Sequence, residues 1–397
     1  MNILVINCGS SSCKFQLFDI DNGKVLAKGN ADRIGIDGVL SYQATGKDKI
    51  EKKVSIPNHK EAVALVLAQL TDKETGVIAD VSEITAVGHR VLHGGKYYSD
   101  SVIVNDDVKA VIKKCFPLGP LHNPANLIGI EACEAALPAG TPQVAVFDTA
   151  FHMTMPPKAY MYALPYEYYE KYSIRRYGFH GTSHRYVSKR AAEFLGLSQE
   201  GLKMITCHLG NGSSFAAVKD GKCVDTSMGL TPLAGICMGT RTGDIDPAIV
   251  PFIMQKEGLT PEEMDTLMNK KSGVLGVSGV SSDFRDLAKA AGEGNERAQL
   301  ALDMFSYQAS KIVGSYAAAM GGVDVIVFTA GIGENTDTIR EAVIKPLEFM
   351  GAKIDPAKNN GTRCEAVISA DDSRVKIVVI PTNEELAIAQ ETEALVR

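Results

Sequence analysis

Two short turns rich in glycine and serine have the composition of anion-binding loops. The first runs over residues 7–12 and the second over residues 210–214, and each lies between two β-rich runs. Such turns offer backbone N–H groups and hydroxyls to negative charge. One turn alone is equally typical of a simple hairpin, but two, one in each half of the chain, suggest that both halves hold a polyphosphate. A P-loop is excluded, because Gly-x-x-x-x-Gly-Lys-Ser/Thr does not occur.

A third glycine-rich turn covers residues 330–335, after a buried run and at the start of a helical pattern. It lacks the last glycine of the dinucleotide fingerprint, so that reading is weak. A helix N-terminus favours negative charge, and glycines let the backbone approach a base closely. In this place the turn predicts contact with a nucleotide.

Four charged residues have surroundings suited to phosphate chemistry. Arg90 and Arg241 lie among glycines, where a loop can direct a planar guanidinium at carboxylate or phosphoryl oxygens. Arginines beside glycine are more often surface or ion-pair residues. Asp148 follows a buried strand directly, and Glu384 begins a helix; both offer the hard oxygen ligands that Mg²⁺ takes. For Glu384 alone, interaction with the helix macrodipole is the commoner explanation.

The elements that position these residues alternate between strands and helices. Asp21-Asn22-Gly23 predicts a hairpin into a further strand, and Asn123 with Pro124 predicts an N-cap and a first helical residue. Apart from these, we expect strands at 3–6, 14–20, 143–147, 204–209, 215–218, 323–329 and 376–380, and helices at 60–70, 283–291, 295–320, 335–350 and 384–396.

One pattern occurs twice: strand, glycine–serine turn, strand, Asp/Asn-Gly-Lys turn, strand. The second copy follows the first by about 200 residues, a spacing that indicates domain duplication rather than a solenoid. A chain of 397 residues is also too long for one ordinary core. The sequence therefore predicts two related α/β domains.

The net charge and composition of the chain limit which binding partners and which cellular compartment we expect. A net charge of −6 gives no basic footprint for nucleic acid. The N-terminus lacks the features of a signal peptide, and no apolar run approaches the ~20 residues of a membrane helix. The eight cysteines are scattered without a Cys-x-x-Cys pair, which favours reduced thiols. We expect a cytoplasmic protein with no nucleic-acid or membrane partner.

A series of motifs along the whole chain resembles those of the acetate kinase (acetokinase) family, in the family's order and without a departure. They are Asn7–Lys14, Gly88–Gly95, Pro120–Pro124, Val146–His152, Tyr177–His184, His208–Ser214, Met238–Asp244, Ser282–Arg285, Phe328–Asn335 and Thr382–Glu385.

The resemblance implies a fold of two duplicated actin-like (ribonuclease H-like) α/β domains around a central cleft. The expected domains are residues 1–150 plus about 384–397, and a nucleotide-binding domain of residues 151–383. The implied activity is reversible phosphoryl transfer between ATP and acetate, with acetyl phosphate and ADP as products. It further implies Mg²⁺, with Mn²⁺ as an alternative, and a homodimer.

The resemblance also assigns roles to residues. It implies that His180 stabilises the transferring phosphoryl group by hydrogen bonding, just before N-cap signals at Thr182 and Ser183; by spacing alone, His180 is equally a capping or core residue. The implied catalytic set is Arg90, Asp148, His180 and Arg241. Acetate is expected against Arg90, His122 and a small apolar pocket of Val91, Leu121, Phe179 and Pro232.

The metal and nucleotide contacts follow from the same motifs. Asn7, Asp148 and Glu384 are the implied metal group. The implied ATP and ADP contacts are Ser10, Ser12, Lys14, His208, Leu209, Gly210, Asn211, Gly212, Asp283, Phe284, Arg285, Gly331, Ile332, Gly333, Glu334 and Asn335. Arg285 is equally explained as an exposed helix residue.

Three other functions compete with this one. A propionate kinase shares every motif, and a pocket distinguishes one methylene by only about 1–3 kcal/mol. A sugar kinase needs a base for the hydroxyl and a polar pocket, which the apolar candidates disfavour. An actin-like, nucleotide-gated scaffold without catalysis has no need for paired arginines and His180 to hold a second anion.

Overall fold

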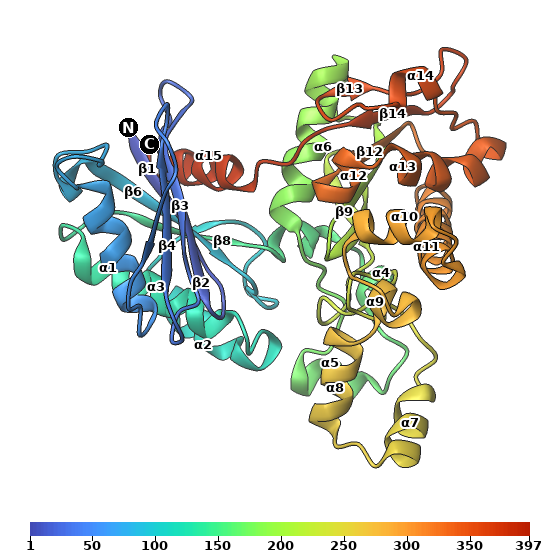
Figure 1. The fold of residues 1–397 in the computed structure, drawn as a ribbon, viewed down its shortest axis with the longest axis horizontal. Coiled ribbons are helices and arrows are strands. Elements are labelled where there is room, and N and C mark those ends of the chain that lie inside the picture. The colour runs from blue at the N-terminus through green and yellow to red at the C-terminus, as the bar shows by residue number, and fades with distance from the viewer. The chain divides into compact units, whose positions relative to one another are not determined.

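The computed structural model describes all residues, 1–397, as two compact units. Unit 1 comprises Met1–Met153 together with Asn383–Arg397, and unit 2 comprises Thr154–Thr382. Figure 1 shows the course of the chain from the blue N-terminus to the red C-terminal helix.

Unit 1 contains one mixed sheet with helices on both faces. Its strands are β1 (Asn2–Cys8), β2 (Ser12–Asp19), β3 (Lys24–Asp32), β4 (Val39–Ala44), β5 (Ile50–Lys53), β6 (Ile84–Val91), β7 (Val102–Ile103) and β8 (Gln143–Phe147). Its helices are α1 (His59–Leu70), α2 (Asp106–Lys114), α3 (Asn123–Ala136) and α15 (Glu384–Val396), with 3₁₀ turns η1 (Val81–Glu83), η2 (Phe116–Leu118) and η3 (Ala150–Thr154), the last ending at the start of unit 2.

Unit 2 contains a second mixed sheet and most of the helices. Its strands are β9 (Lys203–Leu209), β10 (Ser213–Lys219), β11 (Lys222–Thr226), β12 (Val325–Thr329), β13 (Ala366–Val367) and β14 (Lys376–Val379). Its helices are α4 (Pro157–Tyr160), α5 (Tyr166–Tyr172), α6 (Gly181–Leu195), α7 (Ile249–Glu257), α8 (Pro261–Lys270), α9 (Gly273–Ser278), α10 (Phe284–Gly292), α11 (Glu296–Met320), α12 (Ala330–Asn335), α13 (Asp337–Ile344) and α14 (Pro356–Asn359), with the 3₁₀ helix η4 (Lys345–Met350).

The two sheets share one topology. Unit 1 orders its strands β5-β4-β3-β2-β1-β6-β8-β7, and unit 2 orders them β11-β10-β9-β12-β14-β13. In each, the first hairpins are antiparallel, the next two neighbours are parallel, and the edge strand is antiparallel again. The α/β class and the duplication predicted from the repeated hairpins are therefore confirmed.

Successive side chains of β1 point to opposite faces of the sheet, so the strand contributes to a separate core cluster on each face of unit 1. Leu4 and Ile6 pack in a cluster that also contains residues of α1 and α3. Ile3 and Val5 point the other way, into a smaller cluster with Ile388 of α15. Figure 1 shows α15 against one face of this sheet and α1 and α3 on the other. This arrangement places the first residue of α15 beside the strand ends described below.

The long helix α11 forms much of the core of unit 2. Its buried face, which includes Ala301, Phe305 and Val313, packs with Cys207 and Phe215 of the sheet. No helix of the protein has both the length and the apolar character that crossing a membrane requires.

Three local predictions are wrong in detail. The N-cap of α3 is His122 rather than Asn123, whose side chain instead bonds the backbone N–H and carbonyl of His93. The 335–350 segment is two elements, because Thr336 leaves helical geometry between α12 and α13 and the chain continues as the 3₁₀ helix η4, with proline at its start. Thr182 and Ser183 lie inside α6, because its first turn begins after His180, which has a left-handed φ of 56°.

A buried histidine in unit 1 predicts acid sensitivity. His89 of β6 donates Nε2–H to Gln143 Oε1 at 2.6 Å, and its burial lowers its pKa from 6.5 to about 4. Between these values the unfolded chain binds more protons than the folded one, so stability falls as the pH falls. We expect a loss of up to about 3 kcal/mol. Urea unfolding at about pH 4.5 and about pH 7.5 checks this: His89→Gln should lose less stability on acidification than wild type, and equal losses would contradict the assignment.

Candidate active site

The first group of predicted residues meets at one edge of the unit 1 sheet. Asn7, Arg90 and Asp148 lie at or just beyond the carboxyl ends of β1, β6 and β8. These strands are parallel neighbours, so their carboxyl ends share an edge. Arg90 donates from Nη2 to Asp148 Oδ2 at 2.5 Å and from Nη1 to Asn7 Oδ1 at 3.4 Å. The guanidinium is thereby held between a carboxylate and an amide.

The electrostatics of this group combine burial with close charges. Burial raises the pKa of the Asp148 carboxyl, and the Arg90 guanidinium opposes this effect. Burial opposes the charge on Arg90, but Asp148 and Glu384 outweigh it and raise its pKa. The pKa of Glu384 rises to about 7, first because its carboxyl group is buried and then because Asp148 is nearby; Arg90 and Lys14 act in the opposite direction. Two carboxyl groups, Asp148 and Glu384, therefore lie close to one guanidinium, Arg90, which stays charged.

A magnesium ion fits this group. Asp148 Oδ1 is buried and has no hydrogen-bond partner, which leaves one oxygen for a cation or a bound water. No three His, Cys, Asp or Glu side chains are arranged to hold a metal alone. Mg²⁺ usually takes one or two carboxylates and completes its shell with water and substrate phosphates. Asp148 and Glu384, with the Asn7 amide, are suited to that limited role.

The first glycine–serine turn adjoins the group. Gly9 donates its N–H to the Ser12 carbonyl at 2.8 Å, and His59 Nε2 donates to the Gly9 carbonyl at 2.6 Å. Ser10 is exposed and Ser12 half-buried. Lys14 is exposed and lies directly opposite Asn7 in the β1–β2 register, so both side chains are on the same face of the sheet.

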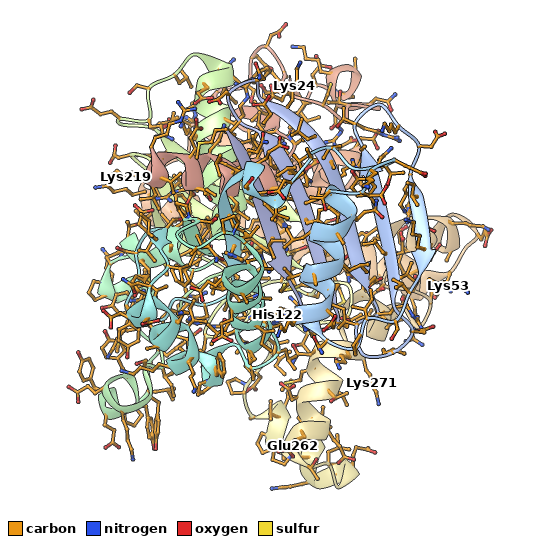
Figure 2. The ribbon with its side chains drawn as sticks, turned by 90° about the vertical axis from the view of Figure 1, so that its left-hand side faces the viewer. Lys24, Lys53, His122, Lys219, Glu262 and Lys271 are labelled. Carbon is orange, nitrogen blue, oxygen red and sulfur yellow. The ribbon has the colours of Figure 1, made fainter.

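The residues expected around the acyl group in unit 1 have different environments. Val91 is fully buried and packs with Phe147. Leu121 is 64% exposed. His122 is half-buried at the start of α3 (Figure 2). In unit 2, Phe179 is buried and Pro232 half-buried.

The second group lies in unit 2 and centres on His180. Its Nδ1 lies 2.8 Å from Ser214 Oγ, whose other contact is His184 Nε2 at 2.7 Å. The opposite ring atom of His184, Nδ1, lies 2.7 Å from Thr206 Oγ1. These four residues come from α6, β9, β10 and the residue before α6, and they form one continuous chain of hydrogen bonds. The chain fixes the orientation of the His180 ring.

His208 stacks on His180, with ring centroids 4.0 Å apart and planes inclined by 20°. Its Nδ1 bonds Ser183 Oγ at 2.8 Å, and that hydroxyl also contacts Thr382 Oγ1 at 2.9 Å. Both rings are therefore held by hydroxyl groups, His180 by Ser214 of β10 and His208 by Ser183 of α6.

Arg241 lies beside this histidine. A Cβ added at Gly212 would be 3.3 Å from Arg241 Nη1 and 3.7 Å from His180 Cε1, so the glycine–serine turn passes close to both side chains. The half-buried guanidinium donates to the Pro232 carbonyl at 3.2 Å and forms no ion pair, and burial lowers its pKa. An arginine remains charged under such conditions. A partly buried cation without a carboxylate partner is suited to an anionic ligand.

The loop that carries Arg241 is fixed by backbone contacts. Met238 donates its N–H to the Arg241 carbonyl, and Val274 donates to the Met238 carbonyl at 2.8 Å. Gly273 has a φ of +62°, and a Cβ there would lie 2.1 Å from the Met238 carbonyl oxygen. This role of Gly273 was not predicted from the sequence, because no local pattern indicates which distant loop a glycine must approach.

Many of the predicted nucleotide contacts surround one pocket of unit 2, with a volume of about 640 Å³. Gly210, Asn211, Asp283, Phe284, Arg285, Gly331, Ile332 and Asn335 line it. Three further residues line the pocket and were not predicted: Ser282, Thr336 and Arg363. Ser282 and Thr336 adjoin predicted residues in the sequence. For Arg363, positive charge is the only sequence feature that could have indicated a role in binding.

Other predicted nucleotide residues play structural parts around this pocket. Glu334 Oε1 accepts the N–H groups of Ala330 at 2.7 Å and Thr382 at 3.0 Å, which ties the turn to the end of β14. Leu209 and Gly333 are buried. Asp283 caps α10 and pairs with Arg285, whose side chain is 90% exposed; this bond lowers the pKa of Asp283 to about 2.

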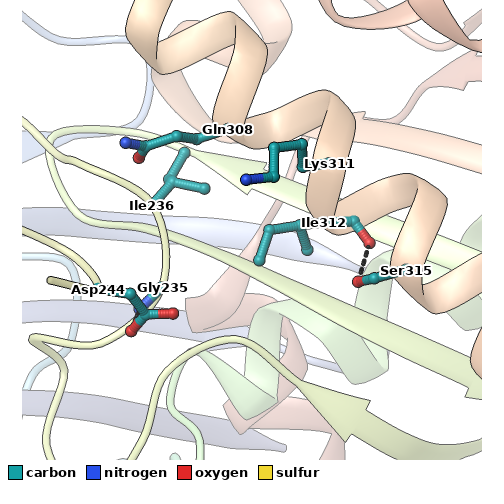
Figure 3. A pocket seen from close by; sticks show the side chains of 7 residues that line it. All are labelled: Gly235, Ile236, Asp244, Gln308, Lys311, Ile312 and Ser315. Carbon is teal, nitrogen blue, oxygen red and sulfur yellow. Dashed lines mark hydrogen bonds between the residues drawn. The ribbon is translucent and has the colours of Figure 1, made fainter. Parts of the chain in front are cut away.

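Another pocket, of about 290 Å³, contains none of the predicted residues. It lies beside α11 and is lined by Gly235, Ile236, Asp244, Gln308, Lys311, Ile312 and Ser315 (Figure 3). The Ser315 hydroxyl bonds the Ile312 carbonyl, and Asp244 Oδ1 accepts the Gly235 N–H, so two of its polar groups serve the local fold.

Comparison with known proteins shows to which family the chain belongs. The model of the acetokinase family matches residues 2–390. The chain belongs to this family. The acetate kinase of Thermoanaerobacter pseudethanolicus is 61% identical over 399 residues, covering 100% of this chain and 99% of that protein. The acetate kinase of Agathobacter rectalis is 59% identical over 397 residues and is covered completely, as is this chain.

Solved structures of the acetokinase family agree with the fold. The crystal structure of Porphyromonas gingivalis acetate kinase superposes with a TM-score of 0.97 at 50% identity, covering 100% of both chains. A propionate kinase from Francisella tularensis gives a TM-score of 0.92 at 44% identity over 99% of each chain.

Proposed function

We propose that this acetokinase-family enzyme transfers a phosphoryl group reversibly and directly from ATP to acetate, giving acetyl phosphate and ADP. The family match and identities near 60% to acetate kinases over full length support the reaction. The structural observation that carries the proposal is Arg241, a half-buried cation with no ion pair beside His180 and the glycine turn.

The chemistry explains why these groups suffice. A carboxylate is already ionised at neutral pH, since carboxylic acids titrate near 4, so acetate needs no general base. The difficulty is that an anion must approach an anionic phosphate. Positioning and preorganised positive charge lower that barrier.

In this scheme, Arg241 and His180 stabilise the transferring phosphoryl group. If Thr206 donates to His184 and His184 to Ser214, the Ser214 hydroxyl donates to His180 Nδ1. The neutral His180 ring then carries its proton on Nε2, where it is a hydrogen-bond donor. His184 and Ser214 are thus positioning residues, which orient His180 and set its tautomer. His208 supports the same ring by stacking.

Unit 1 supplies the groups for the carboxylate and the metal. Arg90, held by Asp148 and Asn7, binds the carboxylate of acetate, with His122, Val91 and Leu121 as the proposed unit 1 surroundings of the acyl group. Asp148, Glu384 and Asn7 are the groups that would hold Mg²⁺ or Mn²⁺. When bound, the ion would neutralise charge on the phosphate oxygens. Ser10 and Ser12 of the first turn, together with Lys14 of β2, are the proposed phosphate contacts of this unit.

The pocket of about 640 Å³ is the proposed site of the ADP moiety. Gly331 gives a clean test, because a Cβ at this position meets nothing within 4 Å and the residue lines the pocket. Gly331→Val should therefore fold normally and fill ligand space. Crowding of this kind costs about 1–3 kcal/mol, so we expect the KM for ATP to rise about tenfold or more.

The matched control for that variant is Gly292→Val at the end of α10, where an added Cβ also meets nothing. Both variants are assayed for the KM of ATP and for thermal stability. An unchanged KM in Gly331→Val would remove this pocket from nucleotide binding.

Propionate kinase is the second candidate, because a propionate kinase structure superposes closely on the whole chain. One methylene changes specificity by about 10–200-fold. The test is kcat/KM for acetate, propionate, butyrate and glycerol, measured as ADP release. A higher value for acetate supports the proposal, whereas a higher value for propionate would replace the substrate and keep the mechanism. The cytoplasmic location and the homodimer stay predictions.

A further inference from the structure

Two thiols lie at the base of the first glycine–serine turn, one on each side of residues 9–12. Cys8 ends β1 and Cys13 lies in β2, and they are exact partners in the β1–β2 register. Their Sγ atoms are 3.5 Å apart. Both side chains are buried, and none of the eight cysteines of the chain forms a disulfide. No assigned role uses this dithiol.

The backbone around the two cysteines suits a covalent bond. Gly9 donates to the Ser12 carbonyl, so the neighbouring pair Cys8 and Cys13 is a non-hydrogen-bonded one. Directly opposed residues of that kind have Cα atoms about 4.5 Å apart. A disulfide spans Cα separations of about 4.4–6.8 Å, so the strands need not part.

The packing holds the sulfur atoms toward each other. Both belong to the core cluster on the α3 side of the sheet, together with Cys133. A Cβ at Gly129 of α3 would lie 2.7 Å from Cys8 Sγ, which shows how closely the helix backs this thiol. The next residues outward, Asn7 and Lys14, point to the opposite face, where the proposed phosphate and metal groups lie.

We propose that Cys8 and Cys13 are an oxidation site, at which a peroxide forms a reversible disulfide across the stem of the turn and slows phosphoryl transfer. The bond would close Gly9, Ser10, Ser11 and Ser12 into a small ring. The effect on turnover rests on the proposed function, but formation of the disulfide does not.

The reaction balances with hydrogen peroxide as the oxidant. One sulfur attacks a peroxide oxygen and breaks the O–O bond, giving a sulfenic acid; the released hydroxide takes the thiol proton to form water. The second sulfur then attacks the sulfenic sulfur and displaces hydroxide, which takes the second thiol proton. Two thiols and one peroxide thus give one disulfide and two waters. A thiol reductant reverses the change by exchange.

The turn has little freedom to absorb this bond. The sulfur atoms must move from 3.5 Å to about 2.05 Å. Meanwhile the turn stays tied by His59 to the Gly9 carbonyl and by the Ile34 N–H to the Ser11 carbonyl at 3.0 Å. A shift of about 1 Å in a positioning group can cost about 10²-fold in rate. We therefore expect turnover to fall by about tenfold or more. Because both thiols are buried, oxidation should be slow.

The test uses the full chain with Cys364→Ser, which removes the exposed cysteine. Enzyme is treated with hydrogen peroxide, unfolded, labelled with N-ethylmaleimide and digested with trypsin. Both thiols lie in the single peptide Met1–Lys14, which has no internal lysine or arginine. Reduced enzyme should give this peptide with two labels; oxidised enzyme should give it unlabelled and two hydrogen atoms lighter. Dithiothreitol should restore both the labels and the activity.

Variants separate this site from other thiols. Cys13→Ala and Cys13→Ser should keep their turnover in peroxide, whereas the matched control Cys133→Ala should stay sensitive. Two labels on the peptide after activity is lost would overturn the proposal. So would equal inactivation of either Cys13 variant, or a disulfide that leaves turnover unchanged. If the chain turned over no acetate at all, the labelling would still report whether the disulfide forms.

Discussion

Replacing Arg241 by alanine should lower kcat by about 10³–10⁵-fold, the range that a cation in this role contributes to phosphoryl transfer. The fold should survive, because the guanidinium makes only a hydrogen bond to the Pro232 carbonyl and a contact with the Met238 sulfur. ATP binding should change little, because Arg241 does not line the proposed nucleotide pocket. The loss should therefore appear in kcat rather than in the affinity for ATP.

The measurement combines steady-state kinetics with calorimetric titration of ADP. Arg374→Ala is the matched control: it removes another unit 2 arginine whose guanidinium bonds a backbone carbonyl, that of Met350, away from the site. Arg241→Lys should recover only part of the rate, because an ammonium group cannot reproduce the planar fork. Near-normal kcat in Arg241→Ala would remove this residue from the mechanism.

Replacing Asp148 by asparagine should lower kcat by about 10²–10³-fold, as loss of one preorganised electrostatic contact does. Asparagine keeps the shape and still offers Arg90 an oxygen, but it removes the negative charge. Asp148 is fully buried, one of its oxygens holds Arg90, and the other has no partner. The variant should therefore also need a higher Mg²⁺ concentration for half-maximal rate.

Magnesium titration of the rate, at saturating ATP and acetate, checks that expectation. The control is Asp225→Asn, which changes a half-buried carboxyl whose pKa is also raised and whose nearby cation is Arg176. Circular dichroism shows whether each variant is folded. An unchanged magnesium requirement in a folded, slow Asp148→Asn would separate Asp148 from the metal and leave it as the partner of Arg90.

The local and repeated features of this fold were predictable from the sequence. Turns of Gly, Ser, Asn and Asp between β-rich runs located both sets of hairpins, because turn chemistry is set by the residues in the turn. Their repetition at half the chain length predicted the shared topology of the two sheets. The bounds of α15 and β8 also agree with the expected ranges.

Features that depend on distant contacts were not predictable. Nothing near Asn123 in the sequence indicates that its side chain bonds the backbone of His93, so the expected N-cap was wrong. The hydrogen-bond chain through His184 and Ser214 joins one helix to two strands. Individually these residues resemble ordinary core polar groups, and only the fold shows that they orient His180.

The candidate site likewise contains residues that local motifs predicted and residues that only tertiary contacts bring in. Arg90, Asn7 and Asp148 were expected from motifs, and their common location follows from neighbouring parallel strands. Arg363 was missed because it stands in a loop without a motif and reaches the pocket only through tertiary packing.

Acyl phosphate formation, trapped as hydroxamate with hydroxylamine, tests the central claim most directly. The enzyme is mixed with ATP, Mg²⁺ and acetate, and hydroxamate is counted against ADP. The account predicts one hydroxamate for each ADP, and almost none with Arg241→Ala. ADP release from wild type without hydroxamate, or product from glycerol and none from any carboxylate, would contradict it.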